Sequence, residues 1–168
     1  MYRKTIASII SIIILGIVAV TVFNNFNNRQ IEYVTTSLKD LGGNEESIIF
    51  KDKPTAFLFF TSWCPYCNED APKVVSVYEK YKDKINLYGI NLINRDERSG
   101  VDKYVVKYKI GYPVLLDEDN KLYKKYGSPG FPTLVFFDKN GKETKRIVGS
   151  TNQNIIDAQF RKAVINFE

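Results

Sequence analysis

The sequence predicts an α/β fold in which a mixed central β-sheet is covered by helices on both faces. Short apolar runs, typical of buried strands, alternate with segments whose apolar residues recur at helical spacing. This alternation favours parallel pairing of the strands. The pair Asn140-Gly141, which lies between two strand-like runs, predicts a hairpin and so adds an antiparallel pair. The 168 residues are enough for one domain with a sizeable core.

The elements of this fold follow one another along the chain. Residues 38–50 contain Gly42-Gly43, and they predict an irregular lead-in with a short strand at 47–50. The run TAFLFFT at 55–61 is continuously apolar, as expected of a strand buried on both faces. The other predicted strands are 85–92, 113–116, 133–137 and 143–148.

Three helices are predicted by apolar residues at helical spacing, and 121–126 is a brief fourth. Pro72 lies inside the first helix and is expected to kink it or to mark its first turns. The apolar faces consist of Val74, Val77, Tyr78 and Tyr81 in the first helix, Val101, Tyr104, Val105 and Tyr108 in the second, and Ile156, Phe160, Ala163, Val164 and Phe167 in the third.

The chain contains 2 Cys and 0 His, and these counts exclude several chemistries. Without histidine there is no Ser-His-Asp triad, no Cys-His nucleophile pair and no imidazole metal ligand. Two cysteines cannot complete a four-ligand Cys/His zinc site. We therefore expect no metal and no cofactor, and any redox or nucleophilic chemistry must be carried by the two cysteines.

The N-terminus has the pattern of a membrane anchor. An uncharged run of 18 residues, Ile6 to Phe23, would span about 27 Å as a helix, close to the thickness of a bilayer core. Arg3 and Lys4 precede it and favour a cytoplasmic N-terminus at 1–5. The expected organisation is a transmembrane anchor at 6–23, a polar tether at 24–37 and an extracytoplasmic domain at 38–168. A cleaved signal peptide is the weaker alternative, because no good small-x-small site follows the run.

The net charge of +5 does not indicate a nucleic-acid partner. Arg3, Lys4 and Arg29 precede the first acidic residue, which leaves 21 basic against 19 acidic residues from there on. Lysines scattered among acidic residues describe a solvated surface, whereas nucleic-acid binding needs a concentrated basic stripe.

The sequence Trp63-Cys64-Pro65-Tyr66-Cys67 lies where a buried strand ends and a helix begins. Unpaired N–H groups and the dipole at a helix N-terminus stabilise an anion, and the thiolate is the reactive form of cysteine. Cys64 is therefore the candidate nucleophile, and Cys67 is placed to resolve a mixed disulfide. Pro65 suits the first helical turn. A structural disulfide is the alternative, but a bridge across two residues would stabilise little.

These motifs resemble those of the membrane-anchored TlpA/ResA-like thiol-disulfide oxidoreductases of the thioredoxin superfamily. The resemblance covers about 38–167 and includes the WCPYC motif, an acidic residue three positions after Cys67, and room for a strand–helix insertion at about 92–116. It also includes the segment GFPT at 130–133. The Pro-Tyr pair departs from the usual family forms and matches that of glutaredoxins, which are compact and lack the insertion.

The resemblance implies roles for further residues. Pro132 corresponds to a cis-proline facing the cysteines, and Phe131 before it offers its backbone to a bound substrate. Trp63, Pro65 and Tyr66 then belong to the substrate-facing surface. Asp70 stands where the family commonly has a glutamate, which implies proton exchange with Cys67; the alternative is that Asp70 only favours the first helical turn.

The resemblance implies an enzyme that exchanges disulfides with protein substrates outside a bacterial cell membrane and is served by a membrane electron donor. Reduction is the expected direction, for example in cytochrome c maturation or on envelope or spore proteins. A disulfide-forming oxidase remains the main alternative. A peroxiredoxin-type peroxidase is less favoured, because Phe57 stands where a proline is expected. A non-enzymatic anchored binding domain is also open.

Overall fold

The computed structural model describes residue 6 and residues 12–24, 37–126 and 129–167. The chain divides into two compact units, Met1–Val34 and Thr35–Glu168. In the first unit, residues 12–24 are helical. No helix among the described residues combines the length and the apolar character that a bilayer span requires. The predicted span includes residues 7–11, and the predicted tether includes 25–36; both of these segments lie outside the described residues, so the anchor stays a prediction.

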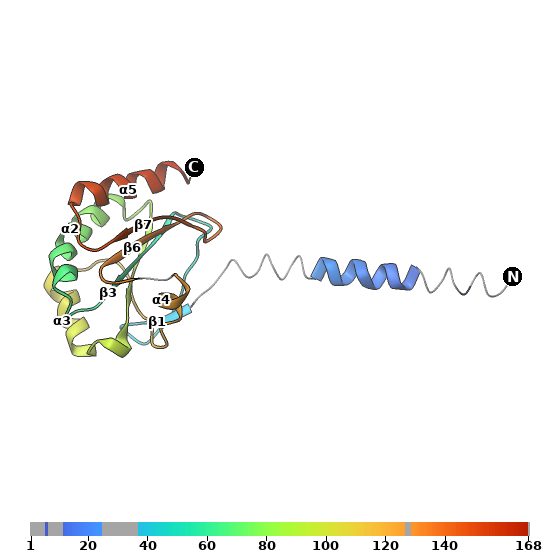
Figure 1. Ribbon diagram of the computed structural model, residues 1–168, viewed down its shortest axis with the longest axis horizontal. Helices are drawn as coiled ribbons and strands as arrows, with labels where there is room; N and C mark the ends of the chain where they lie inside the picture. The colour runs from blue at the N-terminus through green and yellow to red at the C-terminus, as the bar shows by residue number, and fades with distance from the viewer. Residues whose placement is uncertain (1–5, 7–11, 25–36, 127–128, 168) are drawn as a thin grey trace. The chain divides into compact units, whose positions relative to one another are not determined.

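The second unit contains a seven-stranded mixed sheet with the strand order β2-β1-β5-β4-β3-β6-β7 (Figure 1). Parallel pairing joins β3 to β4 and β4 to β5, and the remaining pairs are antiparallel. The strands are β1 (Ser37–Asp40), β2 (Glu45–Ser47), β3 (Thr55–Phe60), β4 (Asn86–Asn91), β5 (Val114–Leu116), β6 (Thr133–Phe137) and β7 (Glu143–Val148). The helices are α2 (Pro65–Tyr81), the short 3₁₀ turn η1 (Ile93–Arg95), α3 (Arg98–Tyr108), α4 (Lys121–Lys125) and α5 (Gln153–Ile165).

Strand β3 lies in the middle of the sheet and is buried on both faces, as its apolar run predicts. Successive side chains of a strand point to opposite faces. Ala56, Leu58 and Phe60 accordingly join the core beneath α2, α3 and α5, whereas Phe57 and Phe59 join the core that includes Leu122 of α4. Helices therefore cover both faces of the mixed sheet, and the predicted thioredoxin-like α/β fold is confirmed.

The lead-in is the main difference from the sequence-based expectation. The short strand predicted at 47–50 is wrong: β2 ends at Ser47, and Ile48 and Phe50 instead pack against one face of the sheet. Residues 37–47 form a hairpin at the sheet edge, closed by Gly43 at φ +84° and by the Asp40 carboxylate, which accepts the Asn44 N–H at 2.8 Å. Three- and four-residue strands rich in polar residues give no apolar alternation, so the sequence pattern did not predict them.

The other elements agree with the predicted order. Pro72 lies within α2, and Phe167, predicted on the last helical face, follows the end of α5. The segment predicted as an insertion, 92–116, forms η1, α3 and β5. The turn at Asn140-Gly141 joins β6 to β7, with Gly141 at φ +70°, where glycine carries no steric penalty.

Candidate active site

Cys64 and Cys67 lie at the start of α2, directly after the central strand. Cys64 is the N-cap residue, Pro65 opens the helix, and the Cys64 N–H donates to the Thr61 carbonyl oxygen at 3.3 Å. Both cysteines are free thiols and both are buried. Cys64 therefore sits where the unpaired N–H groups of the first helical turn favour an anion, as a nucleophilic thiolate requires.

Cys67 is the more enclosed of the two, with 2% of its surface exposed. Burial raises the pKa of the Cys67 thiol well above its ordinary value, and the charges of Cys64 and Asp70 raise it further, while a hydrogen bond with the Thr61 backbone opposes the shift. Cys67 is thus held as a neutral thiol behind Cys64. This difference in environment suits an attacking first cysteine and a resolving second one.

Phe131 and Pro132 directly precede β6 and lie beside Cys64. The peptide bond between them is cis, as the sequence analysis expects for Pro132. The Cys64 thiol donates to the Phe131 carbonyl oxygen at 3.7 Å, a distance compatible with a weak sulfur hydrogen bond. The sequence-predicted residues Cys64, Phe131 and Pro132 are therefore brought together across the fold.

Aromatic side chains lie exposed beside this pair. Trp63 and Tyr66 each have 60% of their surface exposed, and Pro65 between them is exposed as well. The Trp63 indole donates to the Arg95 carbonyl oxygen at 2.7 Å, and its ring meets the edge of Phe131 with centroids 6.5 Å apart. The structure thus places all five residues of the predicted substrate-facing surface around or beside Cys64; whether they bind substrate stays a prediction.

Asp70 lies one turn after Cys67 and is almost fully buried. Its carboxylate accepts hydrogen bonds from Ser150 Oγ at 2.5 Å, Lys73 Nζ at 2.8 Å and the Thr151 N–H at 3.2 Å. Within the described residues none of its hydrogen bonds reaches a sulfur atom. Its charge adds a small contribution to the raised pKa of Cys67, which is due mainly to burial.

Three residues around the cysteines were not predicted from the sequence. Tyr104 of α3 donates its hydroxyl to the Cys67 carbonyl oxygen at 2.9 Å. Asp96 and Asn68 hold the loop between β3 and α2 by further hydrogen bonds. Polar residues 34 to 40 positions apart give no periodic signal, so only the tertiary structure reveals these contacts.

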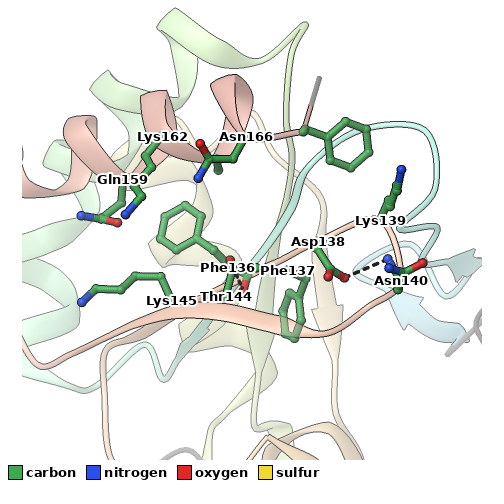
Figure 2. Close-up of a pocket in the computed structure, with 12 residues that line it drawn as sticks. Phe136, Phe137, Asp138, Lys139, Asn140, Thr144, Lys145, Gln159, Lys162 and Asn166 are labelled. Atoms are coloured by element: carbon green, nitrogen blue, oxygen red, sulfur yellow. Dashed lines mark hydrogen bonds between the residues drawn. The ribbon is translucent and has the colours of Figure 1, made fainter.

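A groove lies elsewhere, between the β6–β7 hairpin and the C-terminal part of α5 (Figure 2). Phe136 and Ala163 contribute apolar lining, with Lys139, Lys145 and Lys162 around them. It contains neither cysteine, and the β3–β6 register places the hairpin end of β6 opposite Thr55, at the other end of β3 from the cysteine motif. The groove is therefore not the candidate active site. In the part of the chain that the structure describes, no cluster of His, Cys, Asp or Glu can hold a metal ion.

Comparison with known proteins agrees with this geometry. The Redoxin family model matches residues 32–164. The chain is 30% identical over 114 residues to the sporulation thiol-disulfide oxidoreductase A of Bacillus subtilis, covering 67% of this chain and 69% of the relative. It is 28% identical over 166 residues to the thiol-disulfide oxidoreductase ResA of Bacillus thuringiensis, covering 92% of both chains.

Solved structures show the same fold. The crystal structure of StoA from Bacillus subtilis is similar at a TM-score of 0.66 and 26% identity, covering 75% of this chain and 95% of that one. A secreted disulfide oxidoreductase of Mycobacterium tuberculosis is similar at a TM-score of 0.69 and 24% identity, covering 79% and 98%; at that identity the likeness concerns the fold alone.

Proposed function

From the premise that the chain belongs to the redoxin family and is a thiol-disulfide oxidoreductase, we propose that it is a membrane-tethered, extracytoplasmic reductase of protein disulfides. The observation that carries the proposed chemistry is the unequal pair at the start of α2. Cys64 caps the helix beneath the Phe131 carbonyl oxygen, and Cys67 is buried behind it with a raised pKa.

The proposed reaction has two exchange steps. The Cys64 thiolate attacks one sulfur of the substrate disulfide, which forms a mixed disulfide and releases the other substrate sulfur as a thiolate that takes up a proton. Cys67 then loses its proton and attacks the Cys64 sulfur. The second substrate thiol leaves, and a Cys64–Cys67 disulfide remains. Two electrons have passed to the substrate, and a membrane dithiol donor must return two to the protein.

The exposed aromatic residues support polypeptide substrates. Trp63 and Tyr66 offer apolar surface next to Cys64, and the backbone of Phe131 can pair with an extended chain lying across the cis-proline. Among possible substrates, spore or envelope proteins are supported by the similarity to the sporulation oxidoreductase, and cytochrome c maturation remains the other candidate. A disulfide-forming oxidase is the second candidate function, because the Pro-Tyr pair departs from the family's usual forms.

The redox state of Cys64 and Cys67 in the cell indicates the direction of exchange. In growing cells we expect Cys64 and Cys67 to be mostly reduced, because a reductase must be recharged between turnovers. Acid quenching followed by alkylation with a mass-tagged maleimide measures the two states on a gel. A pair found mostly oxidised would instead favour the oxidase.

The proposed topology rests on the uncharged run at 6–23 and on the basic residues before it. We expect a membrane-impermeant thiol reagent to label Cys64 in intact cells after mild reduction, since the domain that carries Cys64 would lie outside the membrane. The protein should remain in the membrane fraction after a high-salt wash. Labelling that occurs only after cell lysis would contradict the extracytoplasmic placement.

A further inference from the structure

Asn68, the residue after Cys67, reaches back to the loop that carries Cys64. Its Nδ2 atom donates to the Ser62 carbonyl oxygen at 2.8 Å and to the Cys64 carbonyl oxygen at 2.9 Å. Both N–H groups of the side-chain amide are therefore hydrogen-bonded, one to each of the residues that flank Trp63. Because Asn68 is next to Cys67 in the chain, these bonds tie the backbone at one cysteine to the backbone at the other.

The other end of the same amide is held by α3. Asn68 Oδ1 accepts the Tyr108 hydroxyl at 2.8 Å and Lys107 Nζ at 3.4 Å. The ring of Tyr108 packs against Tyr104, with centroids 4.9 Å apart, and the Tyr104 hydroxyl bonds the Cys67 carbonyl oxygen. An asparagine that served only as a solvated surface residue would leave its side-chain oxygen to water. Here that oxygen accepts hydrogen bonds from α3.

The segment 92–116 also holds this loop from another direction. The Asp96 carboxylate accepts both the Ser62 N–H and the Ser62 hydroxyl at 2.5 Å. Gly100 in the first turns of α3 approaches closely, because a Cβ placed there would lie 2.7 Å from Ser62 Oγ. The loop is thus fixed by Asp96 at Ser62 and by Asn68 at Ser62 and Cys64.

We propose that Asn68 is a positioning residue that sets Cys64 relative to Cys67 for disulfide closure, and that Tyr108 supports it. The inference rests on the proposed two-step exchange. Closure requires the Cys67 sulfur to approach the Cys64 sulfur in line with the bond that breaks, so it depends on the relative placement of two backbone segments. Attack by Cys64 on an outside disulfide depends on access to Cys64 and on its ionisation, and not on the placement of Cys67.

The two steps can be separated with the purified full chain and an aromatic disulfide whose released thiolate is coloured. Attack by Cys64 releases the first coloured thiolate and leaves a mixed disulfide. Attack by Cys67 on the Cys64 sulfur releases the second. In Asn68→Ala we expect the second release to be about tenfold slower, which is less than the roughly hundredfold cost of a 1 Å misplacement of a reacting group. The first release should be unchanged or faster.

Tyr108→Phe removes only the hydroxyl that bonds Asn68 Oδ1 and keeps the ring. We expect its second release to be about threefold slower, and the double variant to be no slower than Asn68→Ala alone, because the two residues act through one hydrogen bond. Ser76→Ala, on the same helix but bonded to Gln153 instead, is the matched control and should alter neither step.

An Asn68→Ala protein that closes its disulfide at the wild-type rate would overturn the proposal, and so would a slowing of both steps to the same extent. If the effects of Tyr108→Phe and Asn68→Ala multiply in the double variant, Tyr108 does not act through Asn68. None of these readouts needs a protein substrate, so they separate this inference from a failure of the proposed cellular function.

Discussion

Replacing Cys67 by alanine is expected to convert the protein into a trap that holds its substrates through Cys64. The first exchange step remains, because Cys64 keeps its place at the N-cap of α2, next to the exposed Trp63. The second step is lost, because no other thiol exists in the chain. Mixed disulfides should therefore accumulate and should appear as higher bands on non-reducing gels that collapse on reduction, with the partners identified by mass spectrometry.

The matched control is Cys64→Ala, which keeps one thiol but removes the proposed nucleophile. We expect no adducts from this variant, since Cys67 is only 2% exposed and its pKa is raised by burial. Adducts formed equally by both single-cysteine variants would contradict the assignment of roles. A double variant without cysteines that keeps cellular function would favour the non-enzymatic binding domain, and rapid peroxide consumption by the purified protein would favour the peroxidase.

The features of the site that could be predicted from sequence are those encoded locally. An apolar strand followed directly by Cys-x-x-Cys and a helical pattern places both sulfurs at a helix start, and each part lies within a few residues of the next. Pro132 is distant in sequence, and its place facing the cysteines was expected only from the family resemblance; it directly precedes β6, which pairs with β3.

The contacts that support the site could not be predicted in this way. Asn68, Asp96 and Tyr108 are polar residues whose partners lie on other elements, and no spacing rule links them. The same limit applies to the lead-in. The polar strands β1 and β2 form because the edge of β5 offers unpaired backbone groups, and a single segment of sequence does not show which edge is free.

Asp70 can act on Cys67 in two ways, as a charge that opposes its ionisation or as an acceptor of its proton. The two roles predict opposite results for Asp70→Asn. As a charge, the carboxylate raises the pKa of Cys67, so its removal should favour the Cys67 thiolate and speed disulfide closure. As a proton acceptor, it assists the deprotonation of a thiol that burial keeps neutral, so its removal should slow closure. General-base assistance is worth roughly a hundredfold or more, which exceeds the effect of one partly compensated charge.

We therefore expect closure in Asp70→Asn to be about a hundred times slower near neutral pH. The pH dependence of closure distinguishes the two roles. With its pKa raised, Cys67 ionises unassisted only as pH rises, so closure in the variant should quicken about tenfold per pH unit across the neutral range. In the wild-type protein the closure rate should depend less steeply on pH, because the Asp70 carboxylate accepts the proton that Cys67 loses. The second coloured release from the aromatic disulfide measures both profiles.

Ser150→Ala is the control for this experiment, since Ser150 bonds Asp70 at 2.5 Å without being able to replace its charge. It tests whether disturbing the buried network of Asp70, Lys73 and Thr151 is enough to slow closure. Thermal unfolding of both variants separates a loss of stability from a loss of proton transfer, because Asp70→Asn also weakens the contact with the Lys73 ammonium group. If Asp70→Asn closes faster than the wild-type protein, then Asp70 acts only as a charge beside Cys67, and water must accept the proton.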